Sequence, residues 1–213
     1  MYRAKAAGRA AWRIDGDNQP GVSQQLAKRS RQLALANALG ARLAGITDIQ
    51  AIAEVTVEEL RRAFGYHLSA VIRLRPDGHV DAAAVRGAGF DALRLRGWSQ
   101  PRDHGLIGRC LRERTPVLVN DVRAEPSYQH TPETTDVRAE LVVPLVIDGD
   151  VWGALNIEEL TSNAFDHEDV ILLSTLANQV SAALHAATCS SASRTQRPSC
   201  VARLRPAPSS RPR

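Results

Sequence analysis

The chain has 213 residues, enough for one domain of ordinary size with tails, and an apolar fraction of 44% that can form a core. Its net charge of +4 is uneven, because both tails are basic whereas residues 32–187 carry a net charge of −7, which argues against nucleic-acid binding by this body. No apolar run approaches the roughly 20 residues that cross a bilayer, and no apolar stretch follows the basic N-terminus, so we expect a cytoplasmic protein without a membrane partner.

The first half of the chain predicts two helices and a hairpin. After a turn at residues 19–21, apolar residues recur at helical spacing, and Asp48 is placed to cap a second helix that ends near Gly65. Residues 68–75 then alternate with period two, and a Pro-Asp-Gly turn leads into a returning strand at residues 79–86.

The middle of the chain is less regular. Residues 87–104 are expected to be irregular, residues 105–112 to form a short helix and residues 117–119 a short strand. The polar segment 120–138 is expected to be a long loop, and loops of this length are often functional or locally helical.

The clearest pattern is the second hairpin. Asp148 and Gly149 separate two apolar runs, which is one of the strongest short-range hairpin signals. Asp166 is then placed to begin a long helix whose apolar face runs to Ala187. Strands paired through hairpins predict an α+β fold, an antiparallel sheet with helices against one face.

The domain organisation follows from these patterns. We expect an N-terminal tail at residues 1–22, one domain at residues 23–187 and a disordered tail, rich in Arg, Ser and Pro, at residues 188–213. The helical stripes before and after the sheet can also join two subunits, so a homodimer through the terminal helices is expected.

Five segments resemble motifs of the GAF domain family, in the family's order and spacing. They are residues 105–122 (GLIGRCLRERTPVLVNDV), 125–128 (EPSY), 138–145 (RAELVVPL), 153–158 (GALNIE) and 164–169 (AFDHED). Each segment alone is a weak signal, but together, at the family's spacing, they support a resemblance over about three quarters of the chain.

The resemblance implies a GAF-like antiparallel sheet, with the N- and C-terminal helices packed on one face and a loop-enclosed pocket on the other. It implies a small-molecule-sensing regulatory domain that acts on an output domain such as a histidine kinase or a diguanylate cyclase. Two-component and cyclic-di-GMP signalling are the contexts that such outputs suggest. A dimerisation module without a ligand is the alternative, and a small redox enzyme of the methionine-sulfoxide-reductase kind is a third possibility.

The first nine residues (MYRAKAAGR) resemble the C-terminal end of a diguanylate cyclase, or GGDEF, domain. The signature and the catalytic residues of a cyclase do not occur in the chain, so no cyclase activity is expected. The N-terminal tail is interpreted as a possible remnant of such a domain.

Six residues are expected to bind the ligand, namely Trp98, Leu106, Ile107, Asp121, Tyr128 and Glu140. Trp98 and Tyr128 offer flat apolar walls with a polar edge, and Asp121 and Glu140 can accept hydrogen bonds from the ligand. Asp121 and Glu140 have an alternative role, which is to hold loops together. His104 and His130 lie in segments expected to border the pocket, either as ligand contacts or as exposed loop residues. Nothing in the sequence identifies a cofactor.

No catalytic residues are expected. Cys110 is the only cysteine in the domain body, and a single cysteine on the apolar face of a short helix is typical of a core residue. Cys189 and Cys200 lie in the tail, and the six histidines show no ligand spacing, so neither a disulfide framework nor a metal site is predicted. Trp152 can belong either to the core or to a partner surface.

Overall fold

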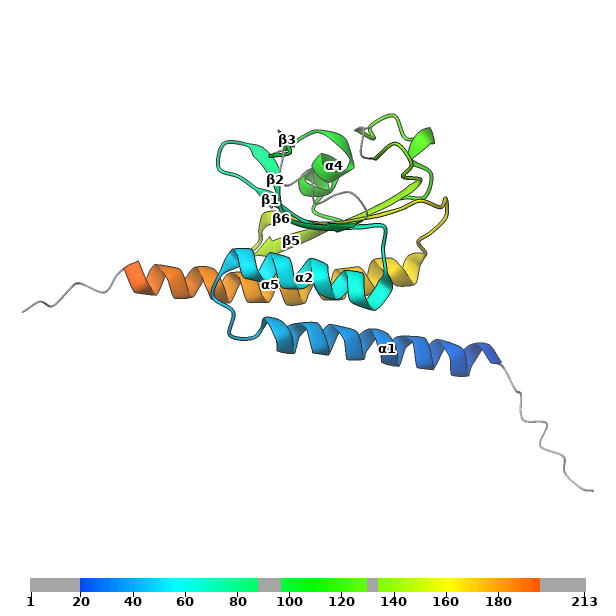
Figure 1. Cartoon of the computed structure of the whole chain (residues 1–213), viewed down its shortest axis with the longest axis horizontal. Coiled ribbons are helices and arrows are strands. Elements are labelled where there is room, and N and C mark those ends of the chain that lie inside the picture. The colour runs from blue at the N-terminus through cyan, green and yellow to red at the C-terminus, as the bar shows by residue number, and fades with distance from the viewer. Residues whose placement is uncertain (1–19, 88–96, 130–133, 196–213) are drawn as a thin grey trace, which may run out of the picture.

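The computed structural model describes residues 20–87, 97–129 and 134–195 (Figure 1). Two hairpins and two short edge strands form one antiparallel sheet with the strand order β3-β2-β1-β6-β5-β4. The strands are β1 (Leu68–Leu74), β2 (His79–Gly87), β3 (Ser99–Pro101), β4 (Val117–Val119), β5 (Ala139–Ile147) and β6 (Asp150–Glu159). Both predicted hairpins are confirmed, and β3 is an addition within the segment expected to be irregular.

Helices cover both faces of the sheet. Figure 1 shows α2 (Ile49–Phe64) and α5 (His167–Thr195) against one face, with α1 (Pro20–Leu43) packed on these two helices. The opposite face carries α4 (Gly105–Glu113), and the short 3-10 helix η1 (Val122–Ala124) follows β4. The expected α+β fold, with its terminal helices on one side of the sheet, is confirmed.

Capping residues define several helix ends. The Asp48 side chain accepts a hydrogen bond from the Gln50 amide at 3.1 Å, and the Gly65 amide, at a φ of 69°, donates to the Arg61 carbonyl at 2.8 Å. Asp166 accepts from the amides of Glu168 and Asp169 at the start of α5. These three predicted ends are confirmed.

Two predicted helix ends are wrong. Pro20 and Gly21, which were expected in a turn, already belong to α1, and a proline is well tolerated in the first turn of a helix. The long helix does not end at Ala187 but continues through Thr195. The hydroxyls of Thr188 and Ser190 donate to helix carbonyls one turn earlier, so these polar residues are satisfied within the helix.

The sheet separates two hydrophobic cores. The core on the helix side contains, among others, Leu43, Ile52, Leu141, Leu155, Ile157 and Leu176. The core on the other side contains Leu106, Cys110, Val117, Val142 and Ala154.

The apolar stretch His167–Ser190 of α5 is long enough to cross a membrane, but 44% of it is buried inside the domain, as in the core helix of a folded domain. Trp152, whose role the sequence left open, is half-buried against the helix-side core.

Candidate functional site

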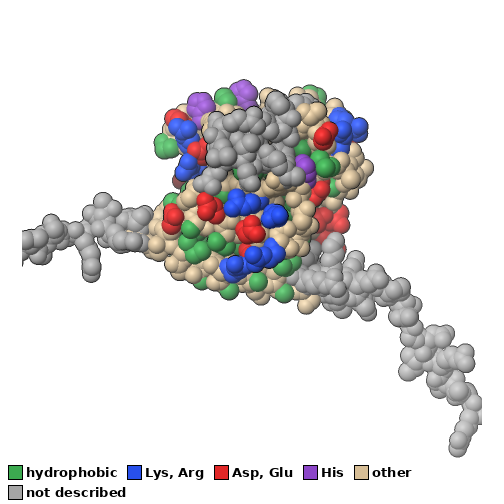
Figure 2. All heavy atoms as spheres, in the orientation of Figure 1, with side chains coloured by type: hydrophobic (Ala, Val, Ile, Leu, Met, Phe, Trp, Pro, Cys, Tyr) green, Lys and Arg blue, Asp and Glu red, His purple; other side chains and the backbone are tan. Residues whose placement is uncertain are grey.

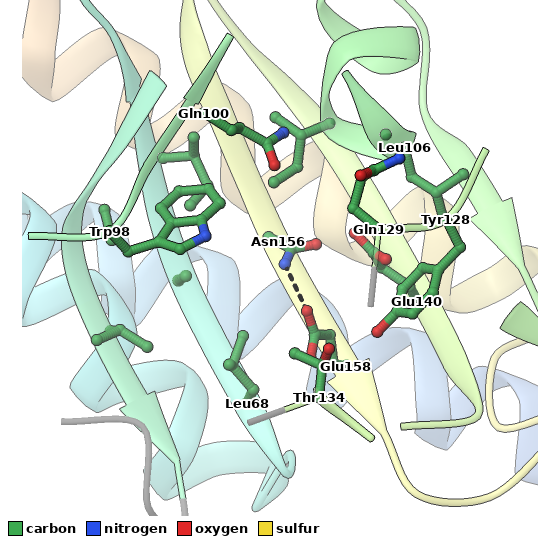
Figure 3. A pocket seen from close by; sticks show the side chains of 16 residues that line it. Leu68, Trp98, Gln100, Leu106, Tyr128, Gln129, Thr134, Glu140, Asn156 and Glu158 are labelled. Atoms are coloured by element: carbon green, nitrogen blue, oxygen red, sulfur yellow. Dashed lines mark hydrogen bonds between the residues drawn. The ribbon is translucent and has the colours of Figure 1, made fainter. Parts of the chain in front are cut away.

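A cavity of about 70 Å³ lies between the sheet and α4 (Figure 3). Strands β1, β2, β5 and β6 contribute to it, together with the start of α4 and residues 98, 100, 128, 129 and 134. Its polar lining residues are Gln100, Gln129, Thr134, Glu140, Asn156 and Glu158. Its apolar and aromatic lining residues include Leu68, Ile72, Trp98, Leu106, Ile107 and Tyr128.

Two glutamates lie side by side on the sheet in this cavity. Glu140 of β5 is the direct cross-strand partner of Glu158 of β6, and their exposed fractions are only 4% and 5%. Asn156, two residues earlier on the same face of β6, donates from Nδ2 to Glu158 Oε1 at 3.0 Å. The antiparallel register therefore brings two carboxyl groups and one carboxamide together in a cavity that is otherwise mostly apolar.

The environment opposes the charged form of both glutamates. Burial raises the pKa of Glu140 well above its ordinary value, and the neighbouring charge of Glu158 raises it further. Burial likewise raises the pKa of Glu158 to about 7, although the hydrogen bond from Asn156 acts in the opposite direction. The two groups titrate as a pair that gives up its protons in two linked steps.

Two polar atoms of this group have no hydrogen-bond partner in the described part of the chain. They are Asn156 Oδ1 and Glu158 Oε2, both buried. A buried acceptor without a donor is costly, and such groups occur most often where a water or a ligand completes them. The cavity therefore offers acceptors to a hydrogen-bond donor.

Two aromatic residues stand on opposite sides of this polar group. Figure 3 shows Trp98 on one side and Tyr128 on the other, with Asn156 and Glu158 between them. Burial raises the pKa of Tyr128, so its hydroxyl stays protonated at neutral pH.

The start of α4 completes the wall of the cavity. Gly108 allows α4 to approach the preceding loop closely, since a Cβ there would lie 2.4 Å from the Asp103 carbonyl carbon.

Five of the six predicted ligand-binding residues line this cavity. These are Trp98, Leu106, Ile107, Tyr128 and Glu140, and their contact with a ligand stays a prediction. Asp121 does not line it, which corrects its assignment as a ligand contact. Its side chain accepts from the Arg123 amide at 3.2 Å and pairs with the Arg123 guanidinium, so it caps η1 and has the alternative, loop-holding role.

The other residues of the predicted pocket border are placed as follows. His104 is exposed, precedes α4 and lies 2.8 Å from Asp103 Oδ1, which fits the alternative of an exposed loop histidine. His130 lies outside the described residues. Arg138 donates to the carbonyls of Thr135 and Val137 and so holds the loop before β5.

Sequence reasoning missed Glu158 and Asn156 as site residues. Both were part of the GALNIE motif, but no role was assigned to them. The period-two alternation of β6 was the available signal, because it places Ala154, Asn156 and Glu158 on one face and Leu155 and Ile157 on the other.

Cys110 has no role in the cavity. Its thiol is buried, lies 3.7 Å from the Val142 carbonyl oxygen, and has a pKa raised to about 12 by burial. Its predicted role as a core residue is confirmed. Across residues 20–87, 97–129 and 134–195, no group of three or more His, Cys, Asp or Glu side chains could hold a metal ion.

Several arginines on the described surface pair with carboxylates. Arg73 pairs with Asp81 at 2.6 Å, and Arg42 pairs with Glu59. In the face shown in Figure 2, acidic and basic side chains are interspersed rather than separated. A continuous basic stripe, the usual mark of a nucleic-acid-binding surface, does not occur on the described part of this face.

Comparison with known proteins identifies relatives at the level of family and fold. The sequence profile of the family described as GAF domain matches residues 46–185. No curated protein matches the chain.

Several solved structures share the fold. A free methionine-R-sulfoxide reductase from Neisseria meningitidis, in complex with its substrate, is 24% identical with a TM-score of 0.68, over 76% of this chain and 93% of that one. The GAF domain of a phosphoenolpyruvate-protein phosphotransferase from Coxiella burnetii is 22% identical with a TM-score of 0.67, over 76% and 96%. A putative GAF sensor protein from Burkholderia vietnamiensis is 18% identical with a TM-score of 0.67, over 76% and 98%.

Proposed function

The chain belongs to the GAF domain family, and we propose that it is a regulatory module that senses a small molecule in the cavity between β6 and α4. The observation that carries the proposal is the buried polar group of Glu140, Asn156 and Glu158, which faces a cavity and leaves two acceptors without a donor. A purely structural core at this place would be more stable with apolar side chains.

A non-catalytic role is part of the proposal. Several of the similar solved structures are free methionine-R-sulfoxide reductases, and that chemistry would need a reactive thiol beside the ligand. Among the described residues no cysteine lines the cavity, since Cys110 is buried in the core and Cys189 lies on α5, across the sheet. The high pKa of Cys110 further opposes its action as a nucleophile.

The terminal helices are the proposed route to an output. α1 and α5 pack on each other on the side of the sheet opposite the cavity, where a neighbouring domain or a second subunit can contact them. An attached histidine kinase or diguanylate cyclase, in a cytoplasmic signalling protein, is the output that fits this arrangement. Occupancy of the cavity would shift the sheet and thereby the helices.

A ligand-free dimerisation module is the second candidate. Leu33 on α1 and Ile171 on α5 are large apolar residues with exposed fractions of 61% and 53%, and a second copy of the chain could cover them. This role and ligand sensing are compatible, and they differ in whether the cavity is occupied.

Purification of the full chain, followed by native mass spectrometry and an absorption spectrum, tests the proposal. We expect a bound mass of small-molecule size, released by denaturation and absent from the Glu158→Gln variant. A chromophore band would identify a pigment ligand. A dimer without ligand, even after incubation with cell extract, would favour the dimerisation module instead.

A further inference from the structure

We infer that the cavity binds a small organic cation, such as a protonated primary amine, through Glu140 and Glu158. The inference rests on the sensing function proposed above and names the class of ligand. Its starting point is the placement of two carboxyl groups as direct cross-strand partners inside a cavity. Like charges in this position destabilise a sheet unless an opposite charge lies between them.

The described part of the chain does not supply that opposite charge. The lining residues of the cavity include no Lys, Arg or His. Arg138 immediately precedes β5, but its guanidinium donates to two loop carbonyls instead of the glutamates. Buried carboxylates are normally paired, so a cation is the partner that the described lining of this site lacks.

The charge of the site suits a single positive charge. The titratable groups near the pair, among the described residues, are Tyr128 from the loop after η1 and Cys110 of α4, with Arg138 just before β5. Tyr128 stays neutral near pH 7. Burial and mutual repulsion raise the pKa of both glutamates and oppose loss of the second proton, so the site carries at most about one negative charge near pH 7 to 8.

The walls favour an organic cation over a metal ion. Trp98, Leu106 and Ile107 offer an apolar and aromatic surface beside the carboxyl groups, as Figure 3 shows for Trp98 and Leu106. An aromatic face attracts an alkylammonium group as well as its alkyl chain. Two carboxylates are also fewer ligands than a stable metal site requires.

The volume limits the size of the ligand. A cavity of about 70 Å³ has room for roughly five water molecules, which corresponds to a molecule of only a few non-hydrogen atoms. Isobutylamine, protonated at neutral pH, has a suitable size, with a branched alkyl group for the apolar wall. Isobutanol and isobutyrate are neutral and anionic molecules of nearly the same shape.

Binding of these three probes to the full chain tests the inference. Their dissociation constants are measured by NMR titration near pH 8 at constant ionic strength, with sodium chloride in place of the amine salt as the reference. We expect isobutylammonium to bind at least ~10-fold more tightly than isobutanol, and isobutyrate to bind most weakly. The preference for the cation should decrease near pH 5, where the pair holds both protons.

Variants assign the effect to the glutamates. Glu140→Gln and Glu158→Gln should each reduce the preference for the cation, and the double variant should abolish it. Asp150→Asn also removes one negative charge from β6, but at the exposed turn, and should leave the preference unchanged. Circular dichroism of each variant checks that the fold is retained. If the double variant is unfolded, the two single variants provide the test.

Each alternative outcome has a defined meaning. Equal or tighter binding of isobutanol or isobutyrate would overturn the cation class and leave a sensing cavity with another ligand. Cation binding that persists in both glutamine variants would overturn the role of the two carboxyl groups. If no probe binds at ~100 mM and the purified chain carries no bound mass, both the ligand class and the sensing function fail.

Discussion

At the scale of single residues, Glu140 and Glu158 have two opposite effects: they destabilise the ligand-free fold, and they give the cavity a charge that can bind a ligand. Their cross-strand pairing in a buried site destabilises the ligand-free fold when both are ionised, whereas the same carboxyl groups give the cavity its only charge among the described lining residues. Binding sites commonly contain groups that are costly to the empty fold. The pH dependence of stability makes this cost measurable.

Glu158→Gln should make the free energy of unfolding less dependent on pH. Because the folded-state pKa of Glu158 is raised to about 7, the native state binds its proton more tightly than the unfolded chain does. Its stabilising effect is therefore complete below the unfolded pKa and is lost as pH rises toward 7 and above. We expect the variant to reduce the loss of unfolding free energy between about pH 5 and 8 by an amount on the order of 2 kcal/mol.

Urea denaturation of the full chain, followed by circular dichroism across this pH range, measures the effect. Asp150→Asn is the matched control and should keep the wild-type slope, since Asp150 is exposed at the hairpin turn. A slope that is the same in Glu158→Gln and wild type would mean that Glu158 titrates in the folded protein as it does in the unfolded chain.

The two described cysteines should differ strongly in reactivity. Cys189 is exposed on α5, whereas Cys110 is buried and its pKa is raised to about 12. Iodoacetamide near pH 8 should alkylate Cys189 in the native protein and reach Cys110 only after unfolding. Peptide mass mapping over time measures both rates. Rapid alkylation of native Cys110 would contradict its core role and strengthen the case for thiol chemistry.

At the scale of elements, the central pairing of β1 with β6 depends on one glycine. A Cβ at Gly153 would lie 2.0 Å from the Ile72 carbonyl oxygen, a backbone atom of the neighbouring strand that cannot move without opening the sheet. Strands β1 and β6 are the two central strands of the sheet and belong to different hairpins, so a change at this contact affects both hairpins.

Gly153→Ala should therefore destabilise the fold by about 3 kcal/mol or more, as measured by urea denaturation. Gly149→Ala in the adjacent turn is the matched control. Gly149 has a φ of +85° but no atom within 4 Å of the added Cβ, so only backbone strain of about 1 kcal/mol is expected. Equal destabilisation by the two variants would show that the close approach of β1 at Gly153 adds no steric cost when a Cβ is present.

The sequence predicted the regular elements better than the irregular ones. The hairpin around Asp148 and Gly149 was predictable because its turn chemistry and its apolar runs are local. Strand β3 has only three residues, Ser-Gln-Pro, and is held by pairing with β2, so no local pattern marks it. The end of α5 was misplaced because polar residues after Ala187 remain compatible with a helix once their hydroxyls bond to its carbonyls.

The candidate site was predictable only in part. Leu106 and Tyr128 lie in the family motifs and Trp98 lies outside them, and all three line the cavity. The pairing of Glu140 with Glu158 depends on the register between β5 and β6, which contains an irregularity between Leu145 and Val146. Counting from the turn alone does not reveal such a shift. Asp121 was misassigned because a capping side chain and a ligand contact look alike in sequence.

At the scale of the whole molecule, the sheet is both the floor of the cavity and the support of α5. Adjacent residues of β6 point to opposite sides, with Glu158 in the cavity and Ile157 in the helix-side core. Asn120, just after β4, adds a second link, since its side chain donates to the carbonyl and accepts from the amide of Phe165, two residues before α5. A change in the cavity can therefore reach the helix through packed side chains and through this clamp.

Ligand binding should consequently protect α5 as well as the cavity. Hydrogen exchange followed by mass spectrometry, with and without isobutylammonium, should show slower exchange in β5 and β6 and also in α5, because local opening of the helix requires the core around Leu155 and Ile157 to loosen. Asn120→Ala should keep the protection of the strands and weaken that of α5. Protection confined to the strands in the wild-type chain would mean that the cavity binds its ligand without transmitting the event to the terminal helices.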